Sequence, residues 1–254
     1  MGTFVFFLYL LFTKQLLKLN WRYKLKKVVV IAGVGLILNT IVFHAALIYL
    51  PGTFVMILEN LAPVFVFSAT LIFYGIKPKS MEVMALLLSF IGIMLIVVGK
   101  SSFPELSDGF YIGIVLGILT GVTFGGYIFF SADLMRDFKN DPNQIICFLF
   151  KIFLISAVTC SPFLFTSKAL PSTSLQWFWL IEMGVLQSGL AYLFWNLALS
   201  HIKANTASIL FLLTIFFTTI NEVLFLNLKL NIFLVLGGLF ICGSGYLIKS
   251  MRQI

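Results

Sequence analysis

Apolar runs of about twenty residues recur along almost the whole of this chain, and each can cross the ~30 Å hydrocarbon core of a bilayer as a helix. The 254 residues include only 17 basic and 9 acidic side chains. So few charges cannot cover the surface of a soluble domain of this size. The sequence therefore predicts an all-α, polytopic membrane protein, a bundle of transmembrane helices.

Turn-forming residues divide the apolar sequence into nine apparent spans, with breaks such as Pro51-Gly52 and Lys77-Pro78-Lys79. The predicted spans cover residues 2–13, 28–49, 53–75, 81–99, 109–131, 143–166, 175–199, 205–227 and 231–248. Because several connections are only a few residues long, consecutive helices are expected to be antiparallel.

The basic residues are unevenly distributed between the two sides of the membrane. One side carries Lys14, Lys18, Arg22, Lys24, Lys26, Lys27, Lys77, Lys79, Arg136, Lys139, Lys203, Lys249 and Arg252. The other carries Lys100, Lys168 and Lys229. The positive-inside rule assigns the richer side, with the C-terminus, to the cytoplasm. The net charge of +8 is then explained by orientation in the membrane, so no nucleic-acid partner is expected. The expected location is the plasma or inner membrane of a bacterial cell.

Two stretches of the chain follow one pattern, beginning at Ala45 and at Asn196. Each has a helix end, a tight turn, a helix opened by small residues, and a last helix with glycines seven residues apart and a Lys-Ser exit. The two exits fall on opposite sides of the predicted membrane, which indicates inverted repeats. We expect a first repeat over residues 1–103 with four spans and a second over 108–250 with five.

The first apolar run, Gly2–Phe12, is short, since eleven helical residues reach only about 17 Å. It lacks the basic leader of a signal peptide. The short first span and the unequal repeats, with four and five spans, favour a chain that lacks the first helix of its first repeat. We therefore expect the upstream reading frame to encode another apolar helix of about 25 residues.

Several of these features resemble the EamA branch of the drug/metabolite transporter (DMT) superfamily. They are "GLAYLFWNLALSHIKANTASIL", "AALIYLPGTFVMILENLAPVF" with its Pro63, and the two terminal helices with spaced glycines. The resemblance covers about residues 2–250 and implies ten helices in two inverted five-helix repeats, the first helix being absent here. It also implies a secondary transporter, usually an exporter of amino acids, related metabolites or drugs, rather than an enzyme. Where the family has a glutamate before each terminal helix, this chain reads "FYGIK" and "FLNLK".

Ionisable side chains within the spans are the first candidate site residues, because a charge near the bilayer centre costs at least ~2.5 kcal/mol unless water or a partner surrounds it. They are Glu59, with its neighbour Asn60, Glu182 and Lys151. Pro63 cannot donate a backbone hydrogen bond to the carbonyl of residue 59, so the helix should open beside Glu59. These residues either line a solute cavity or form a structural ion pair between Lys151 and one glutamate.

A stripe of small and polar residues at helical spacing is the second candidate. It comprises Gly184, Gln187, Ser188, Ala191 and Trp195, with Tyr192 and Asn196 close by. It could line a cavity or serve as packing between helices. Glycines 113, 117, 121 and 125 form a similar smooth ridge, suited to close helix approach or to a cavity wall.

The function predicted from these features is transport of a small organic solute by alternating access around a site near the bilayer midplane. The sequence has no nucleotide-binding motif, and a desolvated carboxylate can carry a proton, so protons are the expected coupling ion. Cys147, Cys160 and Cys242 lie in apolar runs without metal-ligand spacing, so no metal or cofactor is expected. Two glutamates against one lysine favour a cationic or zwitterionic solute. The alternatives are a non-transporting scaffold or assembly protein and an intramembrane enzyme acting on a lipid-linked substrate.

Overall fold

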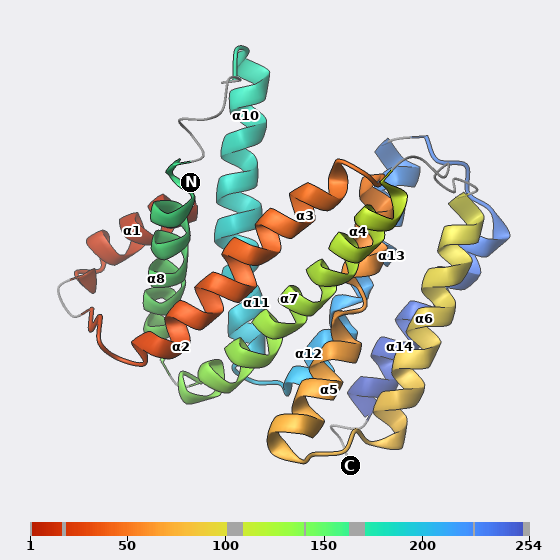
Figure 1. Ribbon diagram of the computed structural model, residues 1–254, viewed down its shortest axis with the longest axis horizontal. Helices are drawn as coiled ribbons and strands as arrows, with labels where there is room; N and C mark the ends of the chain where they lie inside the picture. Colours follow the sequence, from red (N-terminus) through yellow and green to blue (C-terminus); the bar gives the residue numbers. More distant parts are fainter. Residues whose placement is uncertain are drawn as a thin grey trace. The chain divides into compact units, whose positions relative to one another are not determined.

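The computed structural model describes residues 2–16, 19–100, 109–139, 141–162, 171–225 and 227–250, and all regular structure in them is helical (Figure 1). The elements in order are α1 (Gly2–Phe12), α2 (Leu25–Val30), η2 (Ile31–Leu38), α3 (Asn39–Leu47), α4 (Gly52–Glu59), α5 (Ala62–Tyr74), α6 (Ser80–Lys100), α7 (Phe110–Asp137), α8 (Pro142–Cys160), α10 (Ser174–Glu182), η3 (Met183–Ala191), α11 (Tyr192–Leu199), α12 (Ala204–Phe211), α13 (Leu213–Phe225) and α14 (Ile232–Ser250). Elements η2 and η3 are π-helical. The predicted all-α, polytopic class is confirmed.

Each predicted span corresponds to a helical run within the described residues, the seventh to the run formed by α10, η3 and α11. Residues 163–166 of the sixth span and residue 226 of the eighth lie outside the described residues. The runs long and apolar enough to cross a membrane are Leu25–Leu47, Gly52–Tyr74, Ser80–Lys100, Phe110–Asp137, Pro142–Cys160 and Ala204–Phe225. The first and last spans are the shorter apolar helices Gly2–Phe12 and Ile232–Ile248. The fifth span was predicted to end at residue 131 but continues to Asp137. The prediction followed the apolar run, whereas the helix goes on for two further turns that carry charged side chains.

Local sequence sets several of the helix ends. Gly75 ends α5 in the left-handed conformation, with φ of 65°, which glycine adopts without steric cost. Asp141 accepts a hydrogen bond from the backbone N–H of Asn143 at the start of α8, and Pro142 at the first helical position has no N–H to satisfy. Thr173 and Gln176 form a reciprocal capping box at the start of α10.

The chain divides into two compact units, each made of two segments. The first unit comprises residues 1–38 and 130–202, and the second comprises 39–129 and 203–254. Two continuous helical runs, Leu25–Leu47 and Phe110–Asp137, pass from one unit into the other. The compact units therefore do not coincide with the two predicted repeats, which remain a prediction from the sequence pattern.

In the first unit, α8 is the central helix, packing against α1 and η2. The Phe6 and Phe153 rings are 5.8 Å apart between centroids, within the range in which aromatic pairs attract. Leu149 and Ile152, on the buried side of α8, are fully enclosed.

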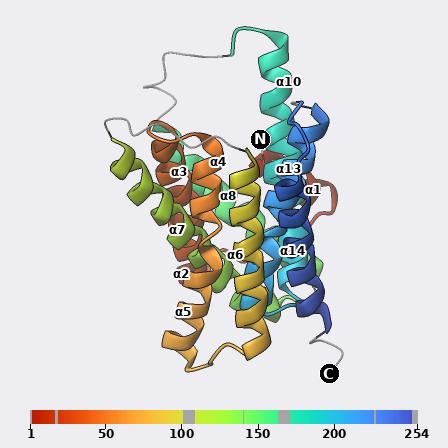
Figure 2. The same cartoon turned by 90° about the vertical axis from the view of Figure 1, so that its right-hand side faces the viewer.

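In the second unit, α6 and α14 form the most extensive helix pair and run side by side (Figures 1 and 2). They are antiparallel: the Asn231 side-chain amide donates to the Gly99 carbonyl at 2.7 Å, and Ser89 donates to Ser244 at 2.6 Å. Between these contacts, the two backbones meet at Gly92 and Gly237. A Cβ on either residue would lie 2.7 or 2.6 Å from the other's carbonyl oxygen.

The opposite face of α6 is apolar and exposed. Its outward side chains, at alternating spacings of three and four, are Met84, Leu87, Ile91, Met94 and Val98. An exposed apolar stripe of this length is uncommon on soluble proteins and suits the hydrocarbon of a bilayer. The stripe therefore agrees with the membrane assignment.

The predicted glycine ridge of α7 packs against the α3–α5 region of the second unit. A Cβ would lie 2.6 Å from Leu50 at Gly113, 2.3 Å from Leu58 at Gly117, 2.8 Å from the Leu58 carbonyl at Gly121 and 3.0 Å from the Ala62 carbonyl at Gly125. The close-approach interpretation of this ridge is therefore confirmed.

Candidate functional site

The residues predicted for the site fall into both units. Glu59 and Asn60 belong to the second unit, and Lys151, Glu182, Gln187, Ser188, Tyr192, Trp195 and Asn196 belong to the first. Each group is therefore described within its own unit.

Glu59 is the last residue of α4, at a break in the span Gly52–Tyr74. Asn60 and Leu61 form a turn, and α5 begins at Ala62 with Pro63 in its first turn. The opened backbone faces α7: a Cβ on Gly121 would lie 2.8 Å from the Leu58 carbonyl oxygen and 3.4 Å from that of Glu59. The predicted opening beside Pro63 is thus present, and it is covered by protein, as a broken helix within a membrane requires.

The Glu59 carboxylate belongs to a polar cluster centred on Asn39 of α3. The Asn39 Nδ2 lies 3.3 Å from Glu59 Oε1, 3.1 Å from the Thr120 carbonyl oxygen and 3.1 Å from Thr123 Oγ1. Thr120 and Thr123 are buried on α7. A single amide thus fixes the carboxylate against two helices. The sequence analysis missed these partners, because an asparagine and two threonines within apolar runs give no distinctive pattern.

Asn60 is buried beside Glu59, with 1% of its surface exposed. Its Nδ2 donates to the Met56 carbonyl at 2.6 Å. Its Oδ1 is buried and has no hydrogen-bond donor among the described residues. A buried amide oxygen without a donor is costly, and it is suited to accept a hydrogen bond from water or a solute.

The predicted polar stripe is rearranged by the π-helix η3. Its i→i+5 hydrogen bonding changes the register between Met183 and Ala191, so the assumed α-helical spacing is wrong there. Gln187 is exposed, whereas Ser188 is half-buried against α1, where a Cβ on Gly2 would lie 3.0 Å from its Cβ. Glu182 is half-buried at the end of α10.

Beyond η3, the stripe continues into α11. Asn196 is fully buried and donates to the Tyr192 carbonyl at 2.8 Å. The Tyr192 ring packs edge-to-face on Phe153, with centroids 5.2 Å apart, and Trp195 is half-buried. These three residues therefore contribute to the packing of α11, and their role in solute binding remains a prediction.

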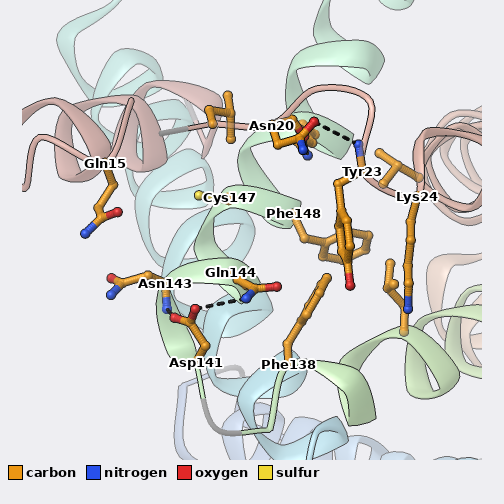
Figure 3. Close-up of a pocket in the computed structure, with 14 residues that line it drawn as sticks. Gln15, Asn20, Tyr23, Lys24, Phe138, Asp141, Asn143, Gln144, Cys147 and Phe148 are labelled. Atoms are coloured by element: carbon orange, nitrogen blue, oxygen red, sulfur yellow. Dashed lines mark hydrogen bonds between the residues drawn. The ribbon is translucent and has the colours of Figure 1, made fainter. Parts of the chain in front are cut away.

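Lys151 lines a sizeable cavity. The cavity, of about 390 Å³, lies in the first unit between the segment before α2 and the facing ends of α7 and α8. Asp141, Asn143 and Gln144 gather opposite Tyr23 and Lys24 (Figure 3). Lys151 is 5% exposed, and its Nζ donates to the Asn20 carbonyl at 2.6 Å. Within the described residues of the first unit, no ion pair joins it to Glu182 or to another carboxylate. The predicted alternative of a pair with Glu59, which belongs to the second unit, stays a prediction.

The other charges around this cavity have identifiable partners. Lys24 forms an ion pair with Asp137, and its hydrogen bond to that carboxylate raises the pKa of the Lys24 ammonium. Lys24 also adopts a left-handed conformation, with φ of 50°, which is uncommon for a residue with a side chain. Asp141 accepts from the Asn143 backbone N–H at 3.1 Å and the Gln144 amide at 3.0 Å. The described residues contain no cluster of three or more side chains able to hold a metal ion.

Comparisons with known proteins agree with this architecture. The EamA-like transporter family matches residues 111–250. The biotin transporter of Salmonella typhimurium is 28% identical over 172 residues, which cover 66% of this chain and 54% of that protein. The biotin transporter of Escherichia coli is 26% identical over 113 residues, covering 44% and 38%. An uncharacterized transporter of Archaeoglobus fulgidus is 27% identical over 209 residues, covering 82% and 70%.

A crystal structure of a protein 17% identical in sequence superposes with a TM-score of 0.77, covering 98% of this chain and 85% of the other. At this identity the match supports the fold alone. The chain spans about half the length of the Salmonella transporter it matches.

Proposed function

The chain belongs to the EamA-like transporter family, and we propose on that premise that it is a secondary transporter that carries a small organic solute by alternating access. The family and the transporter relatives support a multi-pass membrane transporter of small solutes. In the proposed mechanism the two predicted repeats rock about a site near the bilayer midplane, and the C-terminus faces the cytoplasm.

The relatives suggest which solutes should be tried first. Two are biotin transporters, and the sequence resemblance favours amino acids and related metabolites. Biotin and amino acids share a carboxylate on a compact organic body. We therefore place biotin first in a panel that also contains amino acids and drug-like cations, with both uptake and efflux measured.

The polar cluster around Glu59 carries the coupling part of the proposal. Its carboxylate lies within a span, at a broken helix, and its described hydrogen-bond donor is the neutral amide of Asn39. A carboxylate held by a neutral group within a membrane can accept a proton at lower cost than one paired with a cation. Glu59 is therefore proposed as the proton carrier, with Asn60 beside it as a solute-binding group.

Transport by the purified full chain in proteoliposomes tests this role, using Glu59→Gln. This variant keeps the side chain's shape and removes its change of charge. We expect solute exchange across the membrane to continue, whereas accumulation driven by a pH gradient falls to the level of passive equilibration. Glu82→Gln is the matched control, because Glu82 lies outside the predicted site and a glutamine can still accept the hydrogen bond from the Lys79 backbone N–H; this variant should retain gradient-driven accumulation.

Two results would contradict the proposal at different levels. Gradient-driven accumulation by Glu59→Gln at the wild-type rate would exclude the coupling role alone. Failure of the wild-type chain to move any solute of the panel, with or without a gradient, would favour a non-transporting membrane protein.

A further inference from the structure

We propose that the cavity of the first unit binds the carboxylate of a small organic anion, with the Lys151 ammonium as its charge partner. The proposal deepens the transport function, on which its physiological meaning rests, by assigning a solute class and a binding subsite. By the predicted orientation, this cavity lies at the cytoplasmic end of its unit.

The size and lining of the cavity suit a small polar ligand. Its volume of about 390 Å³ falls in the range of metabolite pockets, ~300–1,000 Å³. Gln15, Asn20, Asn143 and Gln144 contribute amide groups, and Val28, Leu134 and Phe148 contribute an apolar wall. A ligand with one charged group and a compact apolar body would match both surfaces.

The charges close to Lys151 favour an anion. Lys24 is paired with Asp137. Asp141 keeps its negative charge, but it lies at the start of α8, ten residues before Lys151, which is about 15 Å along the helix, and its two oxygens accept hydrogen bonds from the Asn143 backbone N–H and the Gln144 amide. Lys151 is the remaining cationic residue of the lining, and the partner described for it is the backbone carbonyl of Asn20. An ammonium group has three N–H donors, so this carbonyl satisfies only one of them.

The position of this lysine leaves its ammonium group dependent on the contents of the cavity. The residue as a whole is 5% exposed, and the acceptor described for its Nζ is one neutral carbonyl, so the other N–H groups are left for water or a ligand in the cavity. A ligand carboxylate would supply a charge-assisted hydrogen bond, among the strongest available to such a group. The sequence favoured a cationic or zwitterionic solute because it counted two glutamates with the lysine. Neither Glu59 nor Glu182 lines this cavity, so that count of charges does not apply to this subsite.

Cys147 provides a reporter within the cavity. It lines the same wall as Lys151, one helical turn earlier on α8, which brings their Cβ atoms to within about 6 Å. With Cys160→Ala and Cys242→Ala in the background, Cys147 is the only thiol. Its modification by anionic (sulfonatoethyl) and cationic (aminoethyl) methanethiosulfonate therefore measures the sign of the local potential.

In the detergent-solubilised full chain, we expect the anionic reagent to react faster at Cys147 once both rates are normalised to a free thiol in solution. Lys151→Met should lower the normalised anionic-to-cationic ratio about tenfold, as expected for loss of a unit charge at this separation. Lys151→Arg should keep the ratio within about twofold. Lys26→Met is the charge-matched control, since Lys26 is exposed and outside the lining, and it should leave the ratio unchanged.

Competition identifies the ligand group. Hexanoate should slow modification of Cys147, whereas hexanamide, of the same shape but neutral, should not, and Lys151→Met should abolish the protection by hexanoate. Equal protection by the two compounds, or an unchanged ratio in Lys151→Met, would overturn the proposal. If Lys151→Met does not fold, the test uses the parent and Lys151→Arg proteins. In both, hexanoate should protect Cys147 and hexanamide should not, and equal protection would overturn the proposal. These measurements require no transport, so their failure is distinguishable from failure of the transport function.

Discussion

At the residue scale, Asn39 is the central group of the polar cluster in the second unit. Asn39→Leu would leave Glu59 Oε1 and Thr123 Oγ1 without this donor while keeping a side chain of similar size. We expect the free energy of unfolding to fall by about 1–2 kcal/mol, the usual cost of leaving buried polar groups unpaired. Thermal unfolding in detergent measures the change.

The neighbouring residue provides the control for this prediction. Thr40 is exposed on the same helix, so Thr40→Leu introduces the same apolar side chain without touching the cluster and should leave stability unchanged. Equal melting temperatures for Asn39→Leu and Thr40→Leu would exclude a stabilising role for the cluster.

At the element scale, the contact between α6 and α14 depends on two glycines facing each other. Gly237→Ala would place a Cβ 2.6 Å from the Gly92 carbonyl oxygen, which forces the backbones apart. Overpacking of this kind costs about 1–3 kcal/mol, so the melting temperature should fall, and Gly92→Ala should act in the same way.

Another glycine of α14 provides the matched control for Gly237→Ala. At Gly243 an added Cβ would meet Leu88 at 3.6 Å, an ordinary contact. Gly243→Ala should therefore be neutral or slightly stabilising, since alanine favours helix over glycine by up to about 1 kcal/mol. A melting temperature of Gly237→Ala equal to that of Gly243→Ala would show that the close backbone contact is not required.

At the scale of the whole molecule, the distribution of basic residues predicts the orientation in the membrane. The segment before α2, the turn between α5 and α6 and the turn between α11 and α12 carry positive charge, and their side should face the cytoplasm. Green fluorescent protein fused after Ile254 should fluoresce, because it folds only in the cytoplasm, and alkaline phosphatase at the same position should be inactive. The opposite pair of results would reverse the topology.

Much of the fold could be predicted from sequence because bilayer thickness and turn chemistry act locally. The apolar runs and breaks such as Pro51-Gly52 and Lys77-Pro78-Lys79 located most helix ends to within a few residues, and the end of α7 to within six. Glu59 and Lys151 were predicted as candidate site residues for a similar reason, because a charged residue within an apolar run is evident from the sequence alone.

The partners of these residues depended on tertiary structure. Asn39 reaches Glu59 from the preceding span, 20 residues earlier, and also donates to Thr123 of α7, 84 residues away. Lys151 meets a backbone carbonyl 131 residues away. The π-helix η3 also changed which side chains of the polar stripe share a face. Hydropathy fixes which segments lie in the membrane, because each residue's transfer between water and hydrocarbon is largely independent of its distant neighbours. Which side chains meet within the membrane is decided by packing between helices, because that depends on the three-dimensional positions of many residues together.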